Sequence, residues 1–172
     1  MLLAATVAGA MPPLAQAQDQ PQLVLGVVDF SGIMAGSKAG KSLKAQADKK
    51  AADFEAEYKK QGKAFTDLEQ KLEEQRASLS KEDYQKKVAD LNAQGKKMRD
   101  ALTDKKQALD AAFNKARDQL KKTLLEIVAD IAKKRGMTVV LNKSDTVLSA
   151  EGFDFSDEAL KRLNEKLPSL KM

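Results

Sequence analysis

Arg76-Ala-Ser-Leu-Ser80 is the short interruption that decides the fold, because it divides a helical region too long for one ordinary helix. The region covers residues 41–135, contains no Pro and only two Gly, and is rich in Ala, Lys, Glu, Gln and Leu, which favour helix. Ser80 followed by Asp83 resembles a helix-starting capping box in which Asp replaces Glu or Gln. We therefore expect a turn near 77–80 and an α-hairpin with arms of roughly 36 and 54 residues.

Apolar residues recur every seven positions on both arms, as in the helices of a coiled coil. The repeat on the first arm consists of Ala51, Tyr58, Phe65, Leu72 and Leu79. The repeat on the second arm consists of Val88, Gly95, Leu102, Leu109 and Ala116. Polar residues at seam positions should weaken the contact, and these are Gln61, Gln75 and Lys105. The arms are predicted to pack along these seams as an antiparallel coiled coil.

Gly62 and Gly95 are the two glycines of this region, and counting from the turn places them at about the same height on facing arms. Each costs about 1 kcal/mol relative to Ala inside a helix. Such a pair is consistent with a hinge and equally with close approach of the two helices. We therefore treat both glycines as hinge candidates and leave the two interpretations open.

The base of the second arm is more apolar than the rest of the hairpin. Its denser stripe comprises Leu120, Leu124, Ile127, Val128 and Ile131. We expect this stripe to dock on a body built from strands.

Three short runs outside the hairpin, residues 23–28, 137–142 and 146–150, are rich in Val and Leu and predict strands. A last helix is expected from Ser156. Three short strands from one chain would leave exposed edges and cannot close a barrel. The expected fold class is α+β and mainly α: a long antiparallel α-hairpin on a small β-barrel body assembled between subunits. The candidate oligomerisation residues are Val24, Val27, Val139, Leu141, Val147 and Leu148.

Missing residue types exclude several classes of enzyme. The chain has 172 residues and no His, Cys or Trp, so it offers no thiol or imidazole nucleophile and no Cys/His zinc site. Residues 36–42 resemble a phosphate-binding loop, but three residues separate Gly36 from Gly40 where the motif needs four. We interpret 36–42 as a small-residue linker into the long helix, and we expect no enzyme, no catalytic or metal site and no cofactor.

Positive charge is concentrated on the hairpin. The chain carries 30 Lys+Arg and 25 Asp+Glu, of which residues 41–135 hold 24 and 17, so the hairpin has a net charge of +7 and the remainder −2. Five lysines of the second arm share one face about 150° from the seam, and they form the cationic stripe Lys86, Lys97, Lys115, Lys122 and Lys133. This stripe is either the solvent-exposed face of an amphipathic helix or an extended binding surface for acidic polymers or anionic lipid. Nucleic acid is not expected, because interleaved aromatic residues are absent.

Residues 1–17 carry no charge and end in Ala15-Gln-Ala17 after an apolar run. An apolar run followed by a small-x-small site is typical of a cleaved signal peptide. The run is also shorter than a transmembrane span requires. We therefore expect the mature chain to start at Gln18 and to be secreted across the inner membrane.

The order of elements resembles the periplasmic chaperone family Skp, also called OmpH. The resemblance is carried by the strand Val24-Leu-Gly-Val-Val-Asp29, the charged hairpin, the strand pair within 136–149, and Phe155-Ser-Asp157 leading into a helix. It covers essentially the whole mature chain and departs from the family at Asn142, where Asp is expected, and in a C-terminal extension over 165–172. It implies a periplasmic homotrimer whose hairpins enclose unfolded outer-membrane β-barrel proteins without ATP.

Three parts of the chain follow from this interpretation. Residues 1–17 form the signal peptide, 18–40 and 136–172 form a β-rich oligomerisation body, and 41–135 form the hairpin. Contact with anionic lipid or lipopolysaccharide stays open, because no distinctive motif for it can be matched. The alternative is a structural coiled-coil envelope protein that holds no client.

Overall fold

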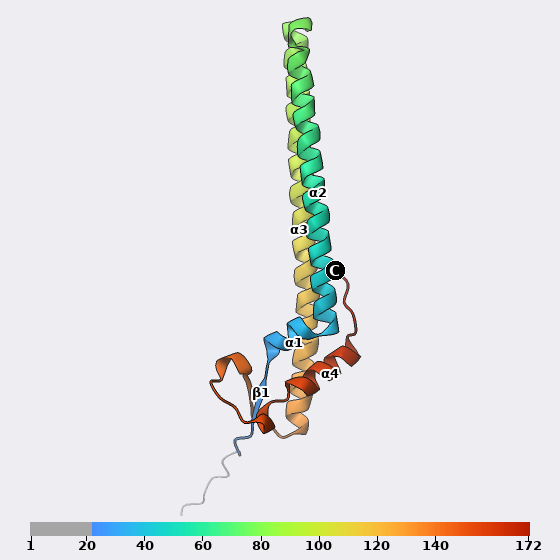
Figure 1. The fold of residues 1–172 in the computed structure, drawn as a ribbon. Coiled ribbons are helices and arrows are strands. Elements are labelled where there is room, and N and C mark those ends of the chain that lie inside the picture. The colour runs from blue at the N-terminus through green and yellow to red at the C-terminus, as the bar shows by residue number, and fades with distance from the viewer. Residues whose placement is uncertain (1–21) are drawn as a thin grey trace, which may run out of the picture.

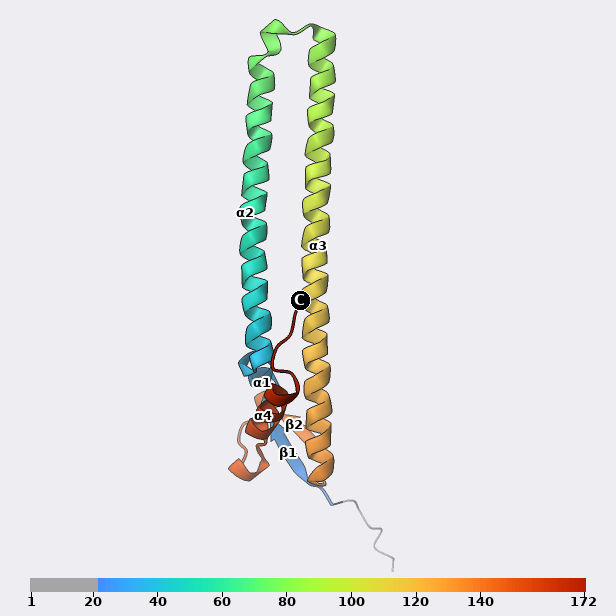
Figure 2. The same cartoon turned by 90° about the vertical axis from the view of Figure 1, so that its right-hand side faces the viewer.

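Two long antiparallel helices project from a small body in the computed structural model, which describes residues 22–172 (Figure 1). Helix α2 spans Lys38–Glu74 and helix α3 spans Lys81–Lys134, and the two arms run side by side (Figure 2). The prediction of a mainly α chain with few strands is confirmed. Within 22–172, no helix has an apolar stretch long enough to cross a membrane. The predicted signal peptide, 1–17, lies outside the described residues.

The hairpin reverses through a short 3-10 turn, η1 (Arg76–Ser78), before α3 begins. Ser80 is the N-cap of α3: the Asp83 backbone N–H donates to its hydroxyl at 3.1 Å, and the hydroxyl donates to the Asp83 carboxylate at 2.7 Å. A full capping box would instead have that carboxylate accept from the Ser80 backbone N–H. Only the Ser80 half of the expected box therefore forms, and it is sufficient to start the helix.

The core of the body lies where the base of α3 meets α1 (Phe30–Gly36) and α4 (Ser156–Lys166). The apolar stripe at the base of the second arm is buried there, together with Ile33 of α1 and Ala159 of α4. The stripe docks on the body as expected, but the strands contribute only Val28 of β1 and the half-buried Val140 of β2 to this core. Helical faces supply most of the apolar surface, because strands of four residues are too short to cover it. The largest fully buried apolar side chains are Leu120, Leu124, Ile131 and Leu163.

A sharp joint at Ser37 connects α1 to α2. Ser37 is fully buried, and its hydroxyl accepts the Gly40 backbone N–H at 3.1 Å, which caps α2. A Cβ at position 40 would lie 1.9 Å from the backbone oxygen of Met34, so this close approach requires glycine. The expected linker over 36–42 is wrong, because residues 38–42 already belong to α2.

Two strands, β1 (Leu25–Val28) and β2 (Val139–Asn142), form a parallel pair with Leu25 opposite Val139. Residues 154–155 cover part of the other edge of β1, through a bridge from Asp154 to Val27. Residues 146–150 are irregular, so the expectation of a third strand is wrong for the single chain. A strand needs a neighbour for its backbone N–H and C=O groups, and within the described chain this segment has no such neighbour.

Candidate functional site

The exposed apolar segment after β2 is the first candidate surface. Val147 is 107% and Leu148 92% exposed, and Val139 and Leu141 of β2 are also exposed. Apolar side chains held this far out of a folded body indicate an interaction surface. Of the other predicted oligomerisation residues, Val27 is buried within the body, and Val24 is half-buried directly before β1.

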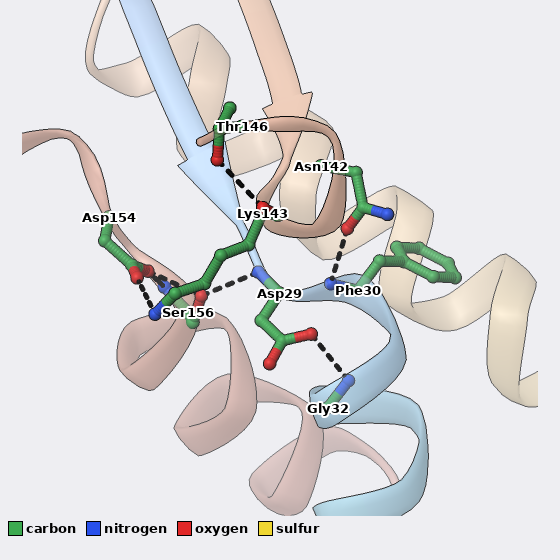
Figure 3. A network of polar contacts seen from close by, with 8 residues as sticks. All are labelled: Asp29, Phe30, Gly32, Asn142, Lys143, Thr146, Asp154 and Ser156. Carbon is green, nitrogen blue, oxygen red and sulfur yellow. Dashed lines mark hydrogen bonds and ion pairs between the residues drawn. The ribbon is translucent and has the colours of Figure 1, made fainter. Parts of the chain in front are cut away.

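A polar network holds this segment against the body (Figure 3). The Asp29 backbone N–H donates to the Ser156 hydroxyl at 2.8 Å, which joins the end of β1 to the start of α4. The Thr146 hydroxyl donates to the Lys143 carbonyl at 2.8 Å, and the Lys143 ammonium pairs with Asp154 at 2.8 Å. The network therefore fixes both flanks of the segment and leaves Val147 and Leu148 outside it.

Asp154 is the acidic centre of this network. Its carboxylate accepts hydrogen bonds from the Lys143 ammonium, from the Ser156 hydroxyl at 2.5 Å and from the Ser156 backbone N–H at 2.9 Å. These donors lower the pKa of Asp154 to about 2, with the Lys143 bond as the largest cause. The network is therefore charged and complete at neutral pH.

Asn142 and Asp29 hold the start of α1, a helix that the sequence patterns did not predict. The Asn142 side-chain oxygen accepts the Phe30 backbone N–H at 3.2 Å, and its amide donates to the Ser144 hydroxyl at 2.6 Å. Asp29 caps α1 by accepting the Gly32 backbone N–H at 2.8 Å. The family resemblance leads us to expect Asp at position 142. An Asp there could also accept the Phe30 backbone N–H, but it has no N–H to donate to the Ser144 hydroxyl. An Asp directly after a strand is a helix N-cap signal that would have revealed α1.

The seam of the hairpin is covered unequally on the two arms. On α3 the predicted repeat is buried or half-buried throughout, whereas on α2 Tyr58 is 59% and Leu68 43% exposed. A polar contact crosses the seam on the base side of these two residues. The Lys105 ammonium of α3 pairs with the Glu57 carboxylate of α2, which also accepts a hydrogen bond from the Gln61 side-chain N–H at 3.0 Å. Glu57 was missed in the sequence, because it lies beside the heptad positions rather than on them. The arms therefore present accessible apolar side chains along a weakly closed seam.

All five lysines of the cationic stripe lie on α3 and are exposed. No stripe lysine forms an ion pair with any residue from 22 to 172, whereas neighbouring Lys96, Lys106 and Lys134 each pair with an Asp on the same helix. The stripe therefore carries positive charge that the described part of the chain does not neutralise by direct pairing.

The two hinge candidates differ in their surroundings. A Cβ on Gly95 would lie 2.8 Å from two ring atoms of Phe65 on the facing arm. Apart from its own helix and chain neighbours, Gly62 has no atom of residues 22–172 within 4 Å of its Cβ position. Both glycines lie inside helices that continue through them. The structure thus adds a packing reason for Gly95 and none for Gly62.

These surfaces are suited to binding. Within residues 22–172, no cluster of three or more acidic side chains is placed to hold a metal ion. The exposed groups are apolar side chains and unpaired ammonium groups, which make weak, non-directional contacts.

A family model described as Outer membrane protein (OmpH-like) matches residues 24–163. A solved protein from Caulobacter crescentus CB15, provisionally assigned as an OmpH-like outer membrane chaperone, superposes with a TM-score of 0.78 at 16% identity. That match covers 91% of this chain and 94% of the other. No curated protein shows significant similarity to the chain.

Proposed function

The chain belongs to the OmpH-like family, and from this premise we propose that it is a periplasmic holdase chaperone. It encloses unfolded outer-membrane β-barrel proteins between its hairpins and prevents their aggregation without ATP. The chaperone assignment of the Caulobacter protein with the same fold supports this proposal.

The observation that carries the proposal is the hairpin with exposed apolar side chains on its first arm. Helix α2 has 37 residues, which corresponds to about 55 Å at 1.5 Å per residue. Tyr58 and Leu68 lie along it, well beyond the buried core. Contacts of this kind are weak singly, but several acting on one flexible chain give high avidity while each contact stays mobile.

The cationic stripe adds a second, electrostatic contribution to client binding. Its five ammonium groups are exposed and have no ion-pair partner within the described chain. Attraction to acidic client segments or to anionic lipid is long-ranged and is weakened by salt. The electrostatic attraction speeds the capture of a client, and the apolar contacts slow its release.

Assembly into a homotrimer completes the proposed chaperone. The outer edge of β2 is unpaired in the described chain, and Val147 and Leu148, in the segment that follows β2 in sequence, are exposed. In the trimer these segments pair between subunits and close one small barrel, which buries the edges that a two-stranded sheet exposes. Three hairpins then surround a common cavity.

Aggregation of a urea-denatured outer-membrane barrel protein on dilution, followed by light scattering, tests the function. The wild-type protein should suppress aggregation at stoichiometric amounts, and the pair Tyr58→Ser and Leu68→Ser should suppress it less. The matched control replaces two exposed polar residues of the same helix, Lys60→Ser and Glu69→Ser. A structural spacer, the alternative function, would leave aggregation unchanged at every ratio.

A further inference from the structure

The segment Leu167–Met172 runs from the end of α4 along one face of the hairpin, beside the base of α2 in Figure 1 and in front of the gap between the two arms in Figure 2. Leu170 is buried and belongs to the main core, and Leu167 and Met172 are half-buried against it. Lys171, between the last two apolar residues, is exposed. This segment follows the residues that match the family model, which end at 163.

Gln46 of α2 holds the backbone of this segment at two points. Its side-chain N–H donates to the Leu170 carbonyl at 2.6 Å, and its side-chain oxygen accepts the Met172 backbone N–H at 3.2 Å. These two groups lie on either side of Lys171 in the chain. In a parallel sheet, a residue likewise bonds to the C=O before and to the N–H after the residue opposite it. Gln46 therefore recognises extended main chain and makes no use of side-chain identity.

The groove continues past Met172. It has a volume of about 330 Å³ and is lined by Ala47, Ala51 and Phe54 of α2 and by Leu109 and Phe113 of α3. Charged Lys50, Lys106 and Asp110 also line it, and Met172 forms the wall where residues 167–172 end, so this volume is the part of the groove that the segment leaves empty. An apolar groove with a backbone-binding amide at one end combines the two features by which extended peptides are bound.

We propose that this groove is a binding site for extended polypeptide with an apolar residue at every second position, and that residues 167–172 are its intramolecular occupant. Leu170 and Met172, with exposed Lys171 between them, show that spacing in the bound segment. Strands of membrane β-barrels alternate apolar and polar residues in the same way. The identity of the incoming polypeptide as a client rests on the proposed function. Client segment and residues 167–172 then compete for one groove.

Competition has a measurable consequence. The apparent Kd of an incoming peptide equals its intrinsic Kd divided by the fraction of molecules whose groove is open. Removing the intramolecular occupant should therefore tighten peptide binding, on the order of tenfold if the segment is bound in about nine molecules of ten.

The probe is a fluorescent peptide with the sequence of 167–172, Leu-Pro-Ser-Leu-Lys-Met, measured by anisotropy. Deletion of 167–172 and the single change Leu170→Ser should both bind it more tightly than the wild type, and Lys171→Ser should not. Gln46→Ala in the deleted protein should abolish the gain. A probe with Ser at the positions of Leu170 and Met172 should fail to bind. Equal affinity of the wild type, the deletion and Leu170→Ser for the first probe overturns the proposal.

A measurement on the wild type remains valid even if the deletion impairs folding. Addition of an unfolded barrel client should shift the Leu170 methyl resonances towards their random-coil values in NMR spectra. If the client binds and these resonances stay in place, the groove is not shared and the proposal fails. If no client binds while the peptide results hold, the proposed function fails and the groove assignment stands.

Discussion

Replacing Gly95 with alanine should affect the hairpin differently from replacing Gly62, although both lie inside long helices. Alanine at a helix interior gains about 1 kcal/mol over glycine. At Gly62 the new methyl group enters open space, so Gly62→Ala should stabilise the protein by about that amount. For a protein of this size, that gain raises Tm by about 2–4 °C.

Gly95→Ala places the methyl group 2.8 Å from Cε2 and Cζ of the Phe65 ring. Overpacking of this kind costs about 1–3 kcal/mol, which cancels or exceeds the helix gain. The expected result is a net effect between zero and about 2 kcal/mol of destabilisation. The two variants should therefore differ by about 1–3 kcal/mol, the size of the overpacking cost.

Urea unfolding followed by circular dichroism at 222 nm, at one fixed protein concentration, measures both changes. Phe65→Leu in the Gly95→Ala background should recover part of the loss, and the double-mutant cycle gives the coupling between the two sites. Equal stabilisation by both alanines would refute the packing role of Gly95. The hinge hypothesis is tested by a separate measurement. If the two glycines act as a hinge, the double variant Gly62→Ala with Gly95→Ala should bind a narrower range of client sizes than the wild type.

Three further predictions concern charge, pH and assembly. Changing all five stripe lysines to Gln should weaken client binding at low salt and flatten its salt dependence, and wild-type affinity that is equal at low and high salt would remove the electrostatic contribution. Asp154 has its pKa lowered from 3.8 to about 2, so its ion pair with Lys143 should stabilise the fold above about pH 4 and be lost as the pH falls towards 2. In Asp154→Asn, the loss of stability between about pH 4 and pH 2 that comes from this ion pair should be absent when acid unfolding is followed by circular dichroism. Identical acid unfolding of the variant and the wild type would contradict this role of Asp154. Val147→Ser with Leu148→Ser should lower the mass in analytical ultracentrifugation from trimer to monomer, whereas an unchanged mass would place the subunit contact elsewhere.

Local sequence patterns were sufficient to predict the hairpin. Heptads, helix-forming composition and a Ser80 cap act within a few turns of the chain, so a mainly α architecture and the reversal near Arg76–Ser78 follow from short-range rules. The same rules separated the apolar seam from the cationic stripe, because both depend only on the 100° step of a helix.

The body could not be predicted in the same way. Residues 146–150 have strand composition but lack a neighbouring strand in the single chain, and strand formation depends on that neighbour. Helix α1 carries a local N-cap signal at Asp29, but its start is also held by Asn142, which lies 112 positions from its partner Phe30. Contacts across such separations leave little trace in local periodicity.

The sequence by itself determined the elements with a regular period, namely the two arms, the seam on the second arm and the charge of both arms. Only the tertiary structure decided which segment packs against the base of the arms, where Gln46 bonds to a residue 124 positions away. It also decided that Gly95 meets Phe65 while Gly62 meets open space. The physical reason is that periodicity reports which face of an element is apolar, whereas the partner of that face is selected by the packing of distant segments.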